Sequence, residues 1–194
     1  CGRLIIAADA WTNDLLQHLG VQLPLTITQE QVTYFASPHY GDYAPDRFPV
    51  WIWMDEPCFY GFPLYGEPAV KVAQDVGGRE VTAQTRTFEP DPAILLRTEE
   101  FLRRHLPSAL GPVHYSKTCL YTMTPDRDFV IDTVPGHPHI AVGLGAAHGF
   151  KFASVIGRLL AGLAGFGPVD ADLTPFAMDR PILLEENPAR SFLI

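Results

Sequence analysis

The sequence contains little lysine, little cysteine and no long run of apolar or basic residues. Among its 194 residues there are 22 acidic and 14 basic side chains, so the formal net charge is −8. Nucleic-acid-binding proteins carry clustered positive charge, and a membrane-spanning helix needs about 20 consecutive apolar residues. Because the sequence has neither feature, we expect no nucleic-acid partner and no membrane partner.

The three cysteines, Cys1, Cys58 and Cys119, do not form the even, closely spaced set that indicates a disulfide framework. We therefore expect a reducing compartment and a cytoplasmic location. No signal-peptide pattern is present. The chain starts at Cys1 and runs almost at once into an apolar strand pattern, so we expect it to be a piece of a longer protein.

Strand-like and helix-like patterns of apolar residues alternate along the chain. We expect strands over residues 4–8, 26–35, 48–54, 58–62, 68–74, 113–122, 129–131 and 139–145. Helices are expected over residues 11–19, 92–105 and 150–163. Asp91 is the expected cap of the second helix, and Pro92 suits its first turn. This order of elements predicts an α+β fold in which the two chain ends form one layer and the middle another. After Gly167 the chain is interrupted by prolines, and we expect it to run over the surface.

A glycine-rich segment, residues 143–149, follows an expected strand and precedes an expected helix. A helix N-terminus in this context can bind phosphate groups. However, His148 stands where the third glycine of the dinucleotide-binding fingerprint would be, and no acidic residue follows before Asp170. We therefore expect a helix start that favours negative charge, and not an independent dinucleotide site.

Eleven arginines are accompanied by only three lysines, which are Lys71, Lys117 and Lys151. Lys71 lies in the apolar stretch 69–73, and Lys151 lies between Phe150 and Phe152. Each could simply extend its ammonium from an apolar patch into water. Alternatively, each could present a partly desolvated ammonium to an anion or an electron acceptor.

Other reactive side chains have plainer interpretations. Cys58 and Cys119 are single cysteines in strand patterns, where cysteine is usually a small buried apolar residue. His137 and His139 have no cysteine or carboxylate at ligand spacing, so we expect no metal site. Cys1 could be the nucleophile of an N-terminal nucleophile hydrolase, with its own amino group as the base, or the lipidated start of a lipoprotein.

Three blocks of sequence are more specific than any single residue: Phe59-Tyr60-Gly61-Phe62-Pro63, Cys119-Leu120-Tyr121-Thr122, and His148-Gly149-Phe150-Lys151-Phe152. In this order and at these separations, they resemble the C-terminal half of the monomeric sarcosine oxidase and N-methyltryptophan oxidase family. These proteins are flavoprotein amine oxidases in the D-amino-acid-oxidase-like group. The resemblance covers nearly the whole chain and implies an FAD-dependent oxidoreductase.

The resemblance implies a set of cofactor-binding residues. Cys119 would carry FAD covalently through its sulfur. Lys71 would lie over the flavin and promote its reaction with O₂, because a fixed positive charge stabilises the negative charge that develops on oxygen. The helix start at Gly149, Phe150 and Lys151 would place its positive end near the flavin.

The resemblance also implies a substrate and the residues that bind it. The substrate would be a secondary or N-methyl amino acid, oxidised to an imine with production of H₂O₂. Tyr60 and His148 would line the substrate pocket, and Lys151 would hold the substrate carboxylate. Two positions depart from the family pattern: Asp75 replaces a frequent histidine, and Asp9 replaces a usual glycine.

The implied organisation divides the chain between two domains. Residues 1–19 and 138–194 would belong to an FAD-binding domain, contributing its last strand and helix, and residues 20–137 would form a substrate domain with a mixed, mostly antiparallel sheet. The parent protein would then be α/β. The family's N-terminal half, with its glycine-rich fingerprint and its arginines, is not in this chain. We therefore expect the chain to be inactive alone and to need that half as a partner. The alternative is a non-catalytic, β-rich binding module that has lost the flavin.

Overall fold

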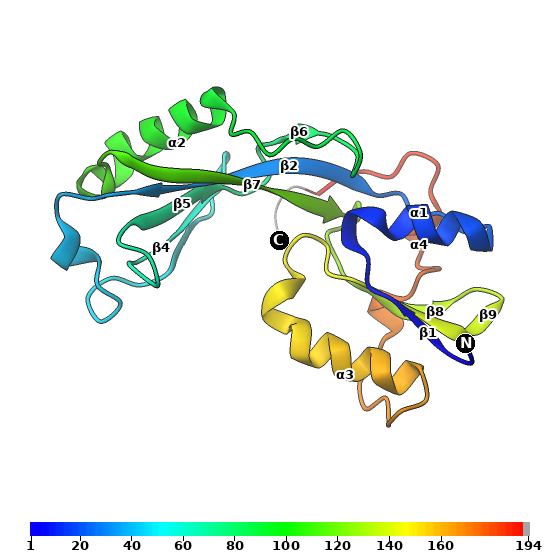
Figure 1. Ribbon diagram of the computed structural model, residues 1–194. Helices are drawn as coiled ribbons and strands as arrows, with labels where there is room; N and C mark the ends of the chain where they lie inside the picture. Colours follow the sequence, from blue (N-terminus) through cyan, green and yellow to red (C-terminus); the bar gives the residue numbers. More distant parts are fainter. Residues whose placement is uncertain (192–194) are drawn as a thin grey trace. The chain divides into compact units, whose positions relative to one another are not determined.

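The computed structural model describes residues 1–191 (Figure 1). The chain forms two compact units: one combines Cys1–Ile27 with the chain from Tyr121 onward, and the other is Thr28–Leu120. Both units contain a sheet and helices, and antiparallel pairs predominate among the strands. The predicted α+β class is confirmed. Within residues 1–191 every helix is too short to cross a bilayer.

The first unit contains a three-stranded sheet in the order β1 (Leu4–Ile6), β9 (His137–Leu144) and β8 (Val130–Val134). Strands β1 and β9 are parallel, whereas β8 and β9 are antiparallel. The sequence predicted a buried strand at residues 4–8, but Leu4 and Ile5 are 42% and 40% exposed. Leu4 and Ile5 are exposed because β1 is at the edge of the sheet, where it pairs only with β9 among the described strands.

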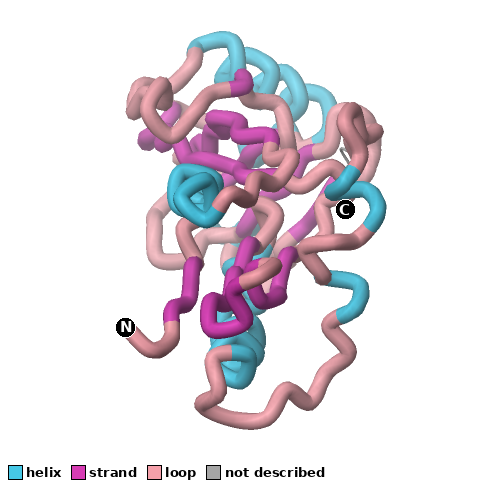
Figure 2. Tube along the Cα trace, turned by 90° about the vertical axis from the view of Figure 1, so that its right-hand side faces the viewer, coloured by secondary structure: helices cyan, strands magenta, loops and turns pink. Residues whose placement is uncertain are grey.

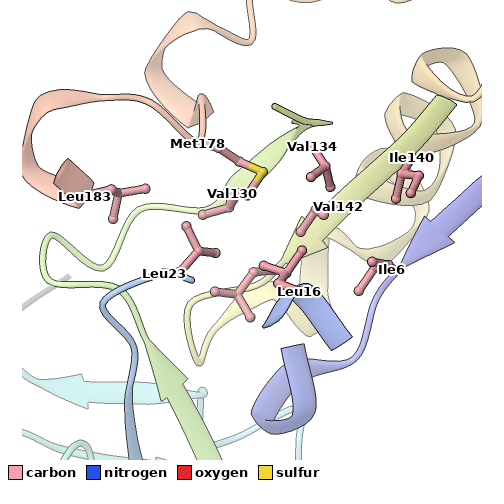
Figure 3. Close-up of a cluster of buried hydrophobic side chains, with 10 residues drawn as sticks. Ile6, Leu16, Leu23, Val130, Val134, Ile140, Val142, Met178 and Leu183 are labelled. Carbon is pink, nitrogen blue, oxygen red and sulfur yellow. The ribbon is translucent and has the colours of Figure 1, made fainter. Parts of the chain in front are cut away.

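Alternate side chains of this sheet enter two different clusters, as the two-residue period of a strand requires. On one face, residues such as Val130 and Val142 pack with Leu16 of α1 (Thr12–Leu16) and with Leu23 (Figure 3). On the other face, Ile131 and Ala141 pack against Leu159 and Leu160 of α3 (Ala153–Leu163). The sheet is therefore covered on both faces within this unit.

The segment after Gly167 runs mostly over the surface, as predicted, but two of its side chains are buried. It is mostly loop, interrupted by a 3₁₀ turn at Thr174–Phe176 and by α4 (Pro181–Leu184) (Figure 2). Met178 and Leu183 are nevertheless buried in the cluster with Leu16, and the Met178 amide donates to Asp132 Oδ2 of β8 at 2.9 Å. Burying one such side chain stabilises a fold by about 1.5–3 kcal/mol, which is enough to hold an irregular segment in place.

The second unit is built on a six-stranded sheet. Its main path is β3 (Trp51–Trp53), β4 (Phe59–Phe62), β5 (Val70–Gln74), β2 (Thr26–Phe35) and β6 (Arg79–Glu80), and β7 (Val113–Met123) also pairs with β2. The predicted bounds of β2 are confirmed. The strand predicted over residues 48–54 is shorter, because Phe48 packs against the Tyr43 ring instead of continuing the ladder.

Helix α2 (Pro92–His105) has the predicted start. The Asp91 carboxylate accepts a hydrogen bond from the Ala93 amide at 2.8 Å, and Pro92 occupies the first turn. Its apolar side packs Phe101 and Leu102 into the second unit's core, whose strand residues are Phe35, Phe59, Val70 and Val72. The face of β5 that carries Val70 and Val72 is therefore covered by α2, and the neighbouring residue Lys71 projects from the opposite face.

Candidate functional site

Lys71 lies in the middle of an aromatic row on the sheet face opposite α2. Across β5, Lys71 pairs with Tyr34 of β2 on one side and with Phe62 of β4 on the other. Directly opposed residues of neighbouring strands project to the same face of a sheet. Tyr60, two residues from Phe62, shares this face.

The Lys71 ammonium is held against aromatic rings. Lys71 Nζ lies 4.8 Å from the centroid of the Phe62 ring and 5.9 Å from that of Tyr60. Burial lowers the pKa of Lys71, and the nearby Cys119 acts in the opposite direction. Of the two interpretations left open above, the structure therefore favours the partly desolvated ammonium over the extended surface lysine.

Cys119 lies on β7 and is the third predicted site residue in this unit. Its side chain is half-buried, and neither it nor Cys58 nor Cys1 is part of a disulfide. Strands β7 and β5 both pair with β2, so Cys119 and Lys71 belong to the same sheet, and Cys119 acts electrostatically on the pKa of Lys71. The structure thus brings Tyr60, Lys71 and Cys119 into one sheet, although they are 11 and 48 residues apart along the chain.

A tyrosine pair beside Lys71 was not predicted from the sequence. The rings of Tyr34 and Tyr115 stack with centroids 4.5 Å apart, and the Tyr115 hydroxyl donates to Glu67 Oε1 at 3.1 Å. Burial, together with hydrogen bonds to Glu67 and Tyr34, raises the pKa of Tyr115 to about 12. The two-residue period of a strand tells which side chains of β2 and of β7 share a face with Tyr34 and Tyr115. However, the sequence does not show that these two strands are neighbours, so the pairing of the rings could not be predicted.

The predicted residues 148–151 lie in the other unit, after β9. Between them and β9, Ala146 and Ala147 have φ angles of 43° and 73°. Such angles are unusual outside glycine and indicate a constrained turn. A Cβ atom on Gly145 would lie 2.9 Å from the Gly149 Cα, so the two ends of this turn approach too closely for a side chain.

The helix predicted over residues 150–163 is divided. Gly149–Phe152 form a 3₁₀ turn, and the α-helix α3 begins at Ala153. Phe150 and Phe152 flank Lys151 in the sequence, but Phe150 is 95% exposed. Only the Phe152 ring contacts Lys151, with Nζ 5.1 Å from its centroid.

His148 connects this turn to the segment before β8. Its Nε2 atom lies 2.9 Å from the Arg127 carbonyl oxygen, and its ring lies 4.8 Å from the Phe129 ring. The Lys151 ammonium donates to the His148 carbonyl oxygen at 3.2 Å. His148 and Lys151, which were both predicted to bind substrate, are therefore neighbours in the structure. Among residues 1–191, no three His, Cys, Asp or Glu side chains gather as a metal site would require.

The close approach of Gly145 to Gly149 gives a stability prediction. We expect Gly145→Ala to destabilise the chain by about 1–3 kcal/mol, the usual cost of forcing an extra methyl group into a packed site. The matched control is Gly157→Ala in the middle of α3, where a Cβ atom would meet nothing within 4 Å. This control should gain up to about 1 kcal/mol of helix propensity. Urea denaturation of both variants tests the pair, and equal stabilities would contradict the proposed close contact.

Comparison with known proteins identifies the family. The family model for FAD-dependent oxidoreductases, the DAO family, matches residues 1–163. The chain belongs to this family. The resemblance drawn from the three sequence blocks is confirmed by this match, which includes all of the predicted site residues in both units.

Curated relatives within the family are amine oxidases. The chain is 31% identical over 188 residues to the monomeric sarcosine oxidase of Bacillus sp. (strain NS-129), covering 95% of this chain and 49% of that protein. It is 35% identical over 183 residues to the N-methyl-L-tryptophan oxidase of Escherichia coli O157:H7, covering 92% and 47%. The chain thus spans about half the length of these relatives.

Solved structures give the same result for the fold. NikD, described as an unusual amino acid oxidase essential for nikkomycin biosynthesis, superposes with a TM-score of 0.75 at 24% identity over 90% of this chain and 47% of its own. The iminodiacetate oxidase of Chelativorans sp. BNC1 superposes with a TM-score of 0.74 at 19% identity, covering 91% and 46%. At these identities the likeness establishes the shared fold.

Proposed function

We propose that this chain is part of an FAD-dependent oxidase of a secondary or N-methyl amino acid, which releases an imine and H₂O₂. The observation that supports this most strongly is the half-buried Lys71 ammonium, which lies over aromatic rings in the same sheet as Cys119. A fixed, partly desolvated positive charge held over aromatic rings is poorly explained by stability alone. Both residues match positions with defined roles in the sarcosine oxidase family.

The residues present fit FAD in two places. In one unit, Cys119 offers a half-buried sulfur for covalent attachment, and Lys71 offers a cation in the same sheet. In the other, the tight turn from Gly145 to Gly149 leaves no room for side chains, as backbone that approaches a ligand requires. When bound, FAD supplies the two-electron acceptor that no protein side chain provides. The residues of this chain then bind, orient and electrostatically stabilise the reacting groups.

The proposed substrate residues have complementary tasks. Lys151, which is exposed in this chain, supplies positive charge for the substrate carboxylate, and its ammonium donates to the His148 carbonyl. Tyr60 supplies an aromatic wall from the face that carries Lys71. Lys71 stabilises the negative charge that develops on O₂, because a preorganised cation needs no rearrangement during the reaction.

A second polypeptide segment completes the proposed enzyme. We assign residues 1–19 and 138–194 to an FAD-binding domain and residues 20–137 to a substrate domain, with the missing glycine-rich half of the FAD-binding domain as partner. The compact units divide instead after Ile27 and Leu120, so β8 shares a unit with β1 and β9. The exposed Leu4 and Ile5 on β1 support this assignment, since a parallel strand with apolar side chains normally lies inside a covered sheet. The three cysteines, none in a disulfide, support a cytoplasmic location.

Two observations test the proposed function. The coding DNA upstream of Cys1 should continue in frame and encode a glycine-rich dinucleotide fingerprint. The full-length protein should be yellow and should consume O₂ when given an N-methyl amino acid. A colourless full-length protein would contradict the proposal and favour the non-catalytic binding module.

Lys151→Ala tests the carboxylate role. Removing one partner of a charge pair that becomes desolvated costs roughly 2–5 kcal/mol, so inhibitors with a carboxylate should bind the variant far more weakly. Neutral analogues should bind almost as well as they bind the unmodified protein. Titration of the flavin absorbance with an acidic and a neutral inhibitor measures both affinities. Equal losses for the two inhibitors would remove Lys151 from the carboxylate site.

A further inference from the structure

The guanidinium of Arg180 holds together the turn at residues 126–129. Arg180 donates through Nε to Asp126 Oδ2 at 2.8 Å and through Nη2 to Asp126 Oδ1 at 2.9 Å. Its Nη1 also donates to the Phe129 carbonyl at 3.0 Å, and Nη2 to the Asp128 carbonyl at 3.2 Å. The Arg180 side chain is only 9% exposed. A bidentate carboxylate pair with two further carbonyl acceptors fixes both distance and orientation.

Arg127 lies between the residues that Arg180 holds. Its φ angle is 61°, and its amide donates to the Thr124 carbonyl at 3.2 Å. A left-handed conformation at a residue other than glycine persists only when its surroundings impose it. Here the flanking Asp126 and Asp128 are both bound by Arg180, so the guanidinium fixes the peptide on each side of Arg127.

The consequence for His148 follows from the Arg127 carbonyl. This oxygen lies 2.9 Å from His148 Nε2. A carbonyl oxygen can only accept, so the Nε2 atom carries the proton and donates it. The neutral imidazole is then confined to one tautomer, in which Nδ1 is the acceptor. Because Lys151 donates to the His148 carbonyl, the backbone of the same residue also locates the Lys151 ammonium.

We propose that Arg180 is a positioning residue for the substrate site: it fixes the Arg127 carbonyl, and thereby the tautomer and orientation of His148. The importance of His148 for substrate binding rests on the proposed function. The effect of Arg180 on the His148 tautomer does not require FAD. Arg180 lies outside residues 1–163, which the family model matches. Its role is therefore an inference from the contacts of this chain.

The test measures the His148 ring nitrogens directly. The chain of 194 residues is labelled with ¹⁵N, and two-dimensional NMR reports the chemical shifts of Nδ1 and Nε2 at a pH where His148 is neutral. In the unmodified chain we expect Nε2 in the protonated range and Nδ1 in the unprotonated range. In Arg180→Gln the two shifts should move toward each other, as exchange between tautomers begins. In Arg180→Lys the two His148 shifts should move less than in Arg180→Gln, because lysine keeps the positive charge but loses the bidentate geometry.

The matched control is Arg158→Gln in the same unit. Arg158 pairs with Asp170 on the surface, where the two side chains are 53% and 55% exposed. This variant also loses one arginine–aspartate pair, and it should leave the His148 shifts unchanged. A change as large as that of Arg180→Gln would mean that His148 responds to any loss of charge, which would overturn the proposal.

Wild-type shifts in a folded Arg180→Gln chain would also overturn the proposal. If that variant does not fold, Asp126→Asn and Arg180→Lys decide the question: both must move the two shifts toward each other, and unmoved shifts in both show that the proposal is wrong. The measurement needs no flavin. Failure of the proposed oxidase function would therefore appear as a protein without activity but with the expected His148 tautomer, whereas failure of this inference would leave activity intact.

Discussion

Replacing Lys71 by methionine is expected to slow the reaction of the reduced enzyme with O₂ by a factor on the order of 10²–10³. Methionine preserves the length of the side chain and its contact with Phe62, but it removes the charge. The rate at which the amine substrate reduces the flavin should change little, since Lys71 is proposed to act on oxygen and not on the amine. Stopped-flow absorbance of the two half-reactions in the full-length protein separates the effects.

Lys117→Met is the matched control for Lys71→Met. Lys117 belongs to β7 in the same unit, and its ammonium also lies over an aromatic ring, 5.3 Å from the Tyr115 centroid. However, Lys117 is exposed, whereas Lys71 is half-buried. Neither half-reaction should change in this variant. If Lys71→Met slows both half-reactions equally, Lys71 is a structural residue, and its proposed role is wrong.

Cys119→Ser should abolish covalent attachment of the flavin completely. Serine has nearly the shape of cysteine but lacks the sulfur that would form the thioether bond. After acid precipitation, the flavin of the unmodified full-length protein should remain with the pellet, and that of Cys119→Ser should be released into the supernatant. Absorbance of the two fractions measures the difference.

Cys58→Ser provides the control for Cys119→Ser. Cys58 is a half-buried cysteine of the same unit, next to Phe59 of β4, and it has no proposed contact with the flavin. Its replacement should leave the flavin attached to the protein. Flavin that stays in the pellet with Cys119→Ser, or that is released by Cys58→Ser, would exclude Cys119 as the attachment site.

Local signals made much of the fold predictable from the sequence. The bounds of β2 and the start of α2 were correct because each depends on neighbouring residues, such as the Asp91 cap and the Pro92 that follows it. The burial of Met178 and Leu183 could not be predicted in this way. It depends on distant partners, among them Leu16 and the Asp132 carboxylate, and no periodic pattern in an irregular segment indicates them.

The candidate site shows the same contrast between residues that local sequence predicts and residues that depend on distant contacts. Cys119 and His148 were predicted from their sequence blocks and Lys71 from its apolar surroundings and the family resemblance, and the structure places Lys71 and Cys119 in one sheet. Tyr34 and Arg180 were missed. Tyr34 lies beside Lys71 because of the register between β2 and β5, and the sequence does not reveal this register without knowledge of the strand order. Arg180 contacts Asp126, which is 54 residues away along the chain. The exposure of Phe150 was not predicted either, because a position beside a lysine in the sequence does not determine packing.

The measurement that tests the central claim most directly is anaerobic mixing of the FAD-loaded full-length protein with an N-methyl amino acid. The account predicts that the absorbance of the oxidised flavin is lost, and that admitting O₂ restores it with release of an equivalent amount of H₂O₂. The contrary result is a bound flavin that stays oxidised with every secondary and N-methyl amino acid offered. That result would show that the chain retains the fold of an amine oxidase without its reaction.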